Sequence, residues 1–191
     1  MDVKELILKN RSCRRFYEDV SIPEDELTEY VDNARLSATG GNVQSLKFII
    51  SGKPETNAII FPTLAWAGYL KDWPGPSEGE RPSAYIIILN DKNISERYWC
   101  NQGIAAQSIL LTAVEKGYGG CMIAAVQREK LAKALNLPGN LEILLVLALG
   151  KPKETVVIEK MGPDGNYKYW RDENQVHHVP KRELKDIILK L

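Results

Sequence analysis

The stretch NQGIAAQSILLTAVEKGYGGCMI, residues 101–123, joins a long apolar helical pattern to a glycine-rich turn and a short strand pattern. Small and apolar residues recur through 98–116, which predicts the longest buried helix of the chain. Gly117 suits the position just after a helix end. The Gly119-Gly120 turn then leads into a short strand that contains Met122. The stretch therefore predicts a buried helix whose chain returns directly into a strand.

Short apolar runs on both sides of this stretch predict further buried strands. These runs cover residues 47–51, 84–89 and 141–149. Helical spacing predicts two short helices near the N-terminus, one around residues 3–7 and one around 24–34, and a third helix over 128–135. A chain of 191 residues with 44% hydrophobic and 26% charged residues is long enough for one globular domain with a sizeable core.

Charge and cysteine content narrow the class of protein. Lys plus Arg and Asp plus Glu both number 25, so no global field favours nucleic acid or an anionic membrane surface, and small-molecule partners are expected. Three cysteines without a CxxC pair favour a reducing compartment. The N-terminal segment has charges among its apolar residues, unlike a signal peptide or a membrane span. We expect a cytoplasmic protein.

The segment RSCRRF, residues 11–16, places three arginines within five positions of a chain without net charge. Arginine forks match phosphate oxygens, and the hydroxyl of Ser12 could complete an anion site. A solvated charged loop at a helix end explains the same residues, because helix C-termini attract cations. Both interpretations stay open on this segment alone.

Polar residues also gather in the turn Thr39-Gly40-Gly41-Asn42-Val43-Gln44, just before a predicted strand. Glycine lets backbone approach a flat ligand, and Asn and Gln amides both donate and accept hydrogen bonds. An ordinary surface turn is the alternative. The sequence has neither a GxGxxG after a strand nor a P-loop, which gives no support to a Rossmann or Walker site.

Metal and thiol chemistry receive little support. His177 and His178 are the only histidines, and as neighbours on a strand they point to opposite faces, which disfavours a shared metal. No histidine or second cysteine lies within sequence reach of Cys13 to form a nucleophilic pair. We expect Cys13, Cys100 and Cys121 to be structural thiols.

Two segments suggest added elements around the domain. A Pro- and Gly-rich connection, residues 74–82, follows Trp66, Tyr69 and Trp73, and could be either an aromatic lid or a passive surface loop. Past residue 150, the segments 167–171 and 175–179 could pair as a hairpin, and 181–190 predicts an amphipathic helix. Such a tail could wrap a second subunit or pack on its own chain.

Taken together, RSCRRF, ATGGNVQ and GYGGCMIAA, followed by a helix and LLVLALGKP, resemble the FMN-dependent nitroreductase family in order and spacing. The similarity continues through NQGIAAQSILLTAVEKG and ends in VPKRELKDIILKL, so it spans the chain from about Glu5 onward. The resemblance implies an α+β, three-layer fold with a mainly antiparallel sheet flanked by helices. It also implies one domain over 1–191, with 152–191 as a C-terminal arm exchanged in a homodimer.

The resemblance assigns FMN contacts residue by residue. The matching positions are Arg11, Ser12, Arg14, Ala38, Thr39, Gly40, Asn42, Gln44, Met122, Ile123, Ala124, Ala125, Lys181 and Arg182. The segment 38–44 would come from the second subunit, the amides of 122–125 would lie beneath the isoalloxazine, and Lys181 with Arg182 would hold the phosphate. Arg15 falls on a variable position, where we expect a solvent or partner contact.

The chain departs from the family pattern at three places. Asn10 stands where a basic residue is common, Ala38 replaces a proline, and Ser45-Leu46 replaces Pro-Trp. On this resemblance Trp66, Tyr69 and Trp73 lie in the variable region over the cofactor, as candidate contacts for planar substrates.

The implied activity is FMN-dependent two-electron transfer from NADH or NADPH to nitroaromatic, quinone or similar small-molecule acceptors, with ping-pong kinetics. No side chain is assigned as catalytic, because flavin N5 takes the hydride; a cation such as Arg14 would stabilise the negative charge of the reduced flavin. Alternatives are a flavin-binding carrier or sensor without turnover, a specialised member such as a reductive dehalogenase, and a structural dimer without flavin.

Overall fold

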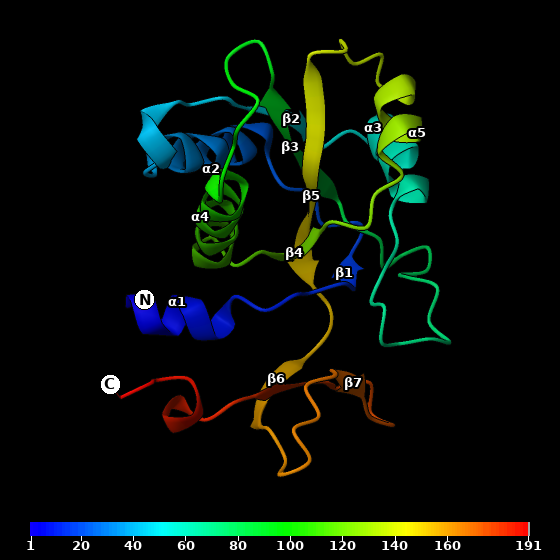
Figure 1. Cartoon of the computed structure of the whole chain (residues 1–191). Helices are drawn as coiled ribbons and strands as arrows, with labels where there is room; N and C mark the ends of the chain where they lie inside the picture. Colours follow the sequence, from blue (N-terminus) through cyan, green and yellow to red (C-terminus); the bar gives the residue numbers. More distant parts are fainter. Residues whose placement is uncertain (191) are drawn as a thin grey trace.

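A five-stranded antiparallel sheet forms the centre of the computed structural model, which describes residues 1–190 (Figure 1). Four strands lie in the order β1-β5-β3-β2, and β4 pairs with β5 as well. Their bounds are β1 Phe16–Tyr17, β2 Leu46–Ser51, β3 Ala84–Asp91, β4 Gly119–Ile123 and β5 Leu141–Pro152. The order leaves one long edge of β2 without a neighbouring strand among the described residues.

Helices cover both faces of this sheet and complete three layers. In Figure 1, α2 and α4 lie on one side and α3 and α5 on the other, while α1 lies beside the end of α4. The helices are α1 Val3–Lys9, α2 Glu24–Leu36, α3 Pro54–Ile60, α4 Asn101–Glu115 and α5 Arg128–Ala134. The α+β, three-layer fold expected from the sequence is confirmed.

Alternation along β3 explains how one strand supplies two cores. Ile86 and Ile88 pack with α2 and α4, whereas Tyr85, Ile87 and Leu89 pack with α3 and α5, and all five are at most 1% exposed. Side chains on successive strand residues point to opposite faces, so a strand covered on both faces reads as a continuous apolar run. This is the origin of the run predicted over 84–89.

Residues 152–190 form a separate small sheet below the main body, which we call the arm (Figure 1). Its strands are β6 Val156–Lys160, β7 Trp170–Arg171 and β8 His177–Lys181. The antiparallel β7–β8 hairpin was predicted, but the parallel pairing of β6 with β8 was not. Leu191, the last residue assigned to the arm, lies outside the described residues.

The helix predicted over 181–190 is wrong. Only a 3-10 turn, Leu184–Asp186, forms there, and four apolar residues of this tail remain 55–85% exposed, namely Leu184, Ile187, Ile188 and Leu189. A short isolated helix is marginal unless its apolar face is buried. The single chain offers this tail no surface on which to bury that face.

Within residues 1–190, no helix combines the length and apolar character needed to cross a membrane.

Candidate functional site

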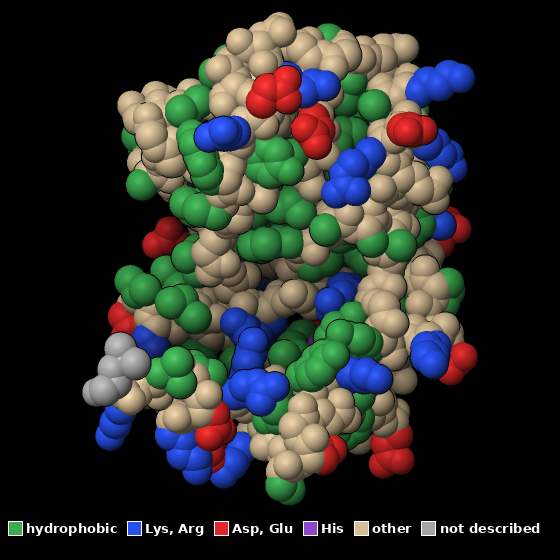
Figure 2. All heavy atoms as spheres, in the orientation of Figure 1, with side chains coloured by type: hydrophobic (Ala, Val, Ile, Leu, Met, Phe, Trp, Pro, Cys, Tyr) green, Lys and Arg blue, Asp and Glu red, His purple; other side chains and the backbone are tan. Residues whose placement is uncertain are grey.

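The N-terminal segment and the arm enclose a cavity of about 260 Å³, here called the basic cavity. Figure 2 shows Lys and Arg side chains around a hollow between the main body and the arm. Three cations and no carboxylate contribute to the wall, which consists of Asn10, Arg11, Ser12, Arg14, Tyr169, His177, Val179 and Lys181. The fold therefore brings together four of the residues predicted from the sequence, Arg11, Ser12, Arg14 and Lys181.

Arg14 is held in this wall by contacts from both sides. Its Nη1 donates to the carbonyl of Ser12 at 3.1 Å and lies 3.4 Å from Nε2 of His177. The guanidinium stacks over the ring of Tyr169, 4.8 Å from the ring centroid. None of these partners is a carboxylate, so the charge of Arg14 remains available to an anion in the cavity.

Arg11 is less completely partnered. Its Nη2 donates to the carbonyl of Ile7, in the last turn of α1, at 2.8 Å. Its buried Nε has no hydrogen-bond partner within residues 1–190. Burial lowers the pKa of this guanidinium. A buried donor without a partner is uncommon in native proteins and indicates a missing water or ligand.

His177 is a residue of this cavity that the sequence did not single out for a ligand. It is 1% exposed, and burial followed by the charge of Arg14 lowers its pKa to about 4. The ring is therefore neutral at pH 7, with Nε2 able to accept from Arg14 and Nδ1 left as a donor without a partner in the described chain. Tyr169 and Val179, on or beside the arm strands, were also missed, since no motif marks them.

Glu154 fastens the arm to the arginine segment. Its fully buried carboxylate accepts from the backbone N–H of Arg14 and from Nη2 of Arg171, the latter at 3.0 Å. Arg171 is itself only 8% exposed and stacks over Trp73. A buried charge pair of this kind fixes geometry, because either partner alone would leave an uncompensated charge.

Arg15 has an ion-pair partner within its own chain that the sequence did not predict. It forms a two-pronged ion pair with Glu80, with nitrogen–oxygen distances of 2.7 and 2.6 Å, and its side chain is 20% exposed. Its neighbour in the chain, Phe16, is fully buried and donates its N–H to the carbonyl of Glu80. Arg15 is therefore an intramolecular anchor of the loop before β3.

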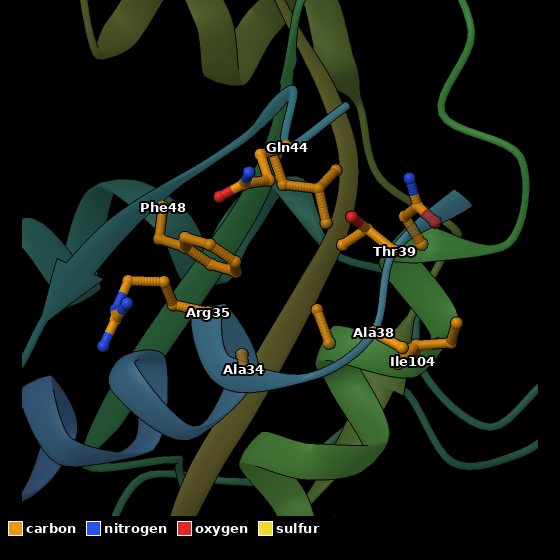
Figure 3. Close-up of a pocket in the computed structure, with 10 residues that line it drawn as sticks. Ala34, Arg35, Ala38, Thr39, Gln44, Phe48 and Ile104 are labelled. Atoms are coloured by element: carbon orange, nitrogen blue, oxygen red, sulfur yellow. The ribbon is translucent and has the colours of Figure 1, made fainter. Parts of the chain in front are cut away.

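The predicted segment 38–44 lines a different cavity, of about 130 Å³, at the start of α4. In Figure 3 the side chains of Thr39, Gln44, Phe48 and Ile104 surround this space, and Ala38 lies at its edge. Gly40 donates its N–H to Oδ1 of Asn101 at 2.8 Å. Asn10 of the basic cavity instead contacts Gln107, almost two turns further along α4, and the two cavities have no lining residue in common.

Backbone strain marks the same segment. Asn42 and Gln44 have φ of 54° and 56°, in the left-handed region that side chains other than Gly adopt at a cost. Gly41 and Asn42 are both exposed. Such strain is typical of segments with a functional constraint.

Residues 122–125 end β4 and line neither cavity. Ile123 is buried, whereas Met122 is 39% exposed on the opposite face of the strand. The carbonyl of Ala125 accepts from Ala65, and that of Ala124 accepts from Arg128. Arg182, the last predicted phosphate contact, is exposed and does not line the basic cavity, unlike its neighbour Lys181.

The three aromatic candidates for substrate contact separate into two environments. Trp66 packs against Phe61 and over Gly75, at the lower edge of a core. Tyr69 is 45% exposed and meets Tyr167 and Tyr169 of the arm at ring distances of 6.1 and 4.9 Å. Trp73 lies beneath Arg171. Tyr69 and Trp73 thus attach the segment between α3 and β3 to the arm.

Cys13, Cys121 and His178 make structural contacts, whereas Cys100 is exposed. Cys13 and Cys121 are buried, and burial raises the pKa of each thiol to about 12, which keeps both protonated. His178 stacks on Trp170 with its Nδ1 3.1 Å from Glu159, on the face opposite His177. Among the described residues, no group of three or more His, Cys, Asp and Glu side chains could hold a metal ion.

Similar proteins share this fold. A protein of Archaeoglobus fulgidus described as an NADH dehydrogenase/NAD(P)H nitroreductase is 27% identical over 158 residues, covering 78% of this chain and 85% of its own. The nitroreductase family protein of Streptococcus pneumoniae TIGR4 superposes with a TM-score of 0.71 at 16% identity over 100% of both chains. An FMN-dependent nitroreductase of Clostridium difficile R20291 gives 0.61 at 21% identity, covering 77% of this chain and 86% of that one.

The sequence profile of the Nitroreductase family matches residues 7–151. This span contains the arginine segment, the 38–44 turn and the whole central sheet except Pro152, the last residue of β5. The chain is therefore an oxidoreductase that belongs to the Nitroreductase family.

Proposed function

We propose that this protein is an FMN-dependent NAD(P)H oxidoreductase that reduces nitroaromatic, quinone or similar small acceptors by two-electron, ping-pong chemistry. The observation that carries the proposal is the basic cavity, where Arg11, Arg14 and Lys181 converge from opposite ends of the chain. The names of relatives, among them an FMN-dependent nitroreductase and NAD(P)H nitroreductases, support the cofactor and the reductant.

The residues of the basic cavity fit the phosphate end of FMN. Three cations without a lining carboxylate suit a dianionic group. The unpartnered Nε of Arg11 and Nδ1 of His177 are donors that acceptor oxygens of a ligand would satisfy. Arg11, Ser12, Arg14 and Lys181 would hold the cofactor, with Arg182 near the outside of the same site.

We propose that the other half of the site comes from a second subunit. Residues 38–44 lie apart from the basic cavity in one chain, as a partner-supplied wall requires. The free edge of β2 and the exposed apolar tail from Leu184 to Leu189 both leave interactions unmade in the single chain. A homodimer in which the end of each arm reaches the second subunit would satisfy these groups, while β6 to β8 stay with Arg14 of their own chain and keep the basic cavity.

Bound FMN would accept a hydride from NADH or NADPH and pass two electrons to the acceptor. With Arg11 and Lys181 on the phosphate, the fixed charge of Arg14, oriented by Ser12 and His177, would be left to stabilise the negative charge that the cofactor gains. Tyr69 contacts Tyr169 of the basic cavity wall and would offer planar acceptors a stacking surface. Met122, which is exposed on β4, would offer a second apolar contact. We propose that Trp66 and Trp73 support the segment that carries Tyr69 and do not contact the acceptor directly.

Purification and anaerobic mixing test the cofactor and the turnover separately. The protein should be yellow, or should bind added FMN, and NADH or NADPH should bleach the flavin on the timescale of turnover. A colourless protein that refuses FMN contradicts the proposal. Flavin that binds but is not reduced by either nucleotide would indicate a carrier or sensor.

Arg14→Ala tests the cavity itself. The variant should lose one of three cations and bind FMN about tenfold or more weakly, measured by flavin fluorescence quenching. Arg97→Ala, at an exposed loop position remote from the cavity lining, is the matched control and should bind like the native protein. Equal FMN affinity for Arg14→Ala and Arg97→Ala would remove Arg14 from the site.

Subunit mixing tests the composite site. Arg14→Ala and Gln44→Ala homodimers should each be defective, because every site contains the altered residue. A co-expressed heterodimer has one site with both changes and one with neither, so it should regain FMN binding at about half the sites. No recovery in a verified heterodimer would place both residues in the same chain's site.

A further inference from the structure

A third cavity, of about 550 Å³, is lined by none of the residues assigned to the flavin. It is enclosed by the turn after β1, by α3 with the 3-10 turn Phe61–Thr63, and by the start of β3. We call it the α3 cavity. Its volume falls in the range of pockets that bind small molecules. Its apolar wall consists of Pro54, Ala58, Phe61, Pro62 and Pro82.

Arg81 is the one cation of this wall, and its charge is not used elsewhere in residues 1–190. The Cζ of its guanidinium lies over the ring of Phe61, 4.6 Å from the centroid, which holds the cation against the apolar wall. Its buried Nε has no hydrogen-bond partner in the described chain. By contrast, Arg15 is paired with Glu80, the residue that precedes Arg81 in the chain.

Two buried hydroxyl groups stand in the same wall, besides that of the exposed Ser21. Ser83 is 8% exposed and its Oγ has no partner among residues 1–190, while Tyr85 is fully buried. Burial raises the pKa of Tyr85, so its hydroxyl keeps its proton at neutral pH. The wall therefore contains a buried cationic donor and a buried hydroxyl that lack partners, as expected where a ligand completes the hydrogen bonding.

The remaining polar residues limit the charge of that ligand. Glu18 also lines the cavity, and its Oε2 accepts from the backbone N–H groups of Gly79 and Arg81. This carboxylate balances the charge of Arg81, so the wall is neutral overall. A neutral wall opposes a dianion such as phosphate, whereas a monoanion can still pair with the guanidinium of Arg81. Asn57 accepts from the hydroxyl of Ser51 and donates to the carbonyl of Ser83, so one N–H of its amide is left for a ligand.

We propose that the α3 cavity binds a small organic monocarboxylate with a flat apolar body. The carboxylate would pair with Arg81 within reach of the Ser83 and Tyr85 hydroxyls, and the body would pack on Phe61 and the prolines. This site is distinct from the flavin and acceptor sites and does not depend on the proposed function.

Calorimetric titration of the purified protein with benzoate tests the site, with benzyl alcohol and inorganic phosphate as matched probes. Benzoate should bind in the millimolar range or tighter, and the two other probes at least tenfold more weakly. Amide shifts in NMR spectra should concentrate at Phe61, Ser83 and Tyr85. Failure of benzoate to bind, or shifts confined to residues 11–14, would overturn the proposal.

Arg81→Gln and Ser83→Ala locate the interaction. Arg81→Gln should weaken benzoate binding about tenfold or more, and Ser83→Ala by a smaller factor, while Arg97→Gln should leave it unchanged. The small Ser83→Ala change keeps the test valid if Arg81→Gln does not fold. Native benzoate affinity in both folded variants, or in Ser83→Ala alone where only it folds, would contradict the site.

Discussion

The main body and the arm are stabilised in different ways. In the body, β3 and the centre of β5 are buried on both faces by helices, and apolar contacts fill both cores. In the arm, His177 is the one residue of 156–190 classed as fully buried, and polar contacts with Arg14 and Glu154 hold the small sheet in place. Apolar packing therefore stabilises the body, whereas the arm is stabilised chiefly by its contacts with the N-terminal segment and by the buried Glu154 ion pair.

Leu147→Ala should give the largest loss of stability, because Leu147 is fully buried in β5 between the helices and the sheet. Truncation removes apolar contact and leaves a cavity, so the free energy of unfolding should fall by about 3–5 kcal/mol. Urea unfolding measures this change. Leu36→Ala, at a 66% exposed position of α2, is the control. A loss below about 1 kcal/mol would mean that the body does not rest on this core.

Glu154→Gln should loosen the arm. The change leaves Arg171 as a buried cation without its counter-charge, and the amide retains part of the hydrogen bonding, so we expect a loss of about 2–3 kcal/mol. Limited proteolysis should cut first within the arm. Glu183→Gln, which affects exposed lysine partners, should change stability by less than about 1 kcal/mol. Unchanged resistance to protease would show that other contacts hold the arm.

Glu80 should give a pH-dependent effect in the body. The Arg15 hydrogen bonds, with a smaller contribution from Lys153, lower its pKa from 4.5 to about 2. A lowered carboxyl pKa stabilises the fold above pH 4.5, and this stability is lost as the pH falls from about 5 toward 2. Glu80→Gln should therefore cost about 1–2 kcal/mol at pH 7 and almost nothing near pH 2, measured by urea unfolding.

Glu96→Gln, on an exposed loop, is the control for that pH series. An equal loss for Glu80→Gln at both pH values would show that shape, rather than charge, makes Glu80 important.

Leu184→Ala should give the smallest effect on the fold, because the side chain is 67% exposed in the single chain. We expect a change within about 0.5 kcal/mol at low protein concentration. If the arm is exchanged between subunits, the same change should weaken dimerisation, measured by sedimentation over a concentration series. Unchanged dimer affinity would mean that this part of the tail lies outside the interface.

The body was predictable from the sequence because its signals are local. The run over 84–89 arises from residues that face a core on both sides of the sheet, and the helix of 98–116 arises from a segment that buries most of its apolar side chains. The structure confirms both with shifts of a few residues. The short α3, Pro54–Ile60, escaped because seven residues with one fully buried side chain give little periodicity.

The site was predictable only in part, for a related reason. Arg11 and Arg14 stand in a dense motif, but Tyr169 and His177 reach the same cavity through tertiary packing that no local pattern encodes. The fate of Arg15 depended on Glu80, 65 positions away. The final helix was predicted from amphipathic spacing, which fails where the chain supplies no surface to cover.

The wall of the basic cavity joins residues 10–14, beside the main body, to residues 169–181 of the arm. Neither segment encloses the cavity alone. A proteolytic cut that releases the arm should therefore abolish the cavity while the central sheet, to which β6, β7 and β8 do not contribute, stays paired. Anion affinity would then serve as a sensor of whether body and arm are still joined.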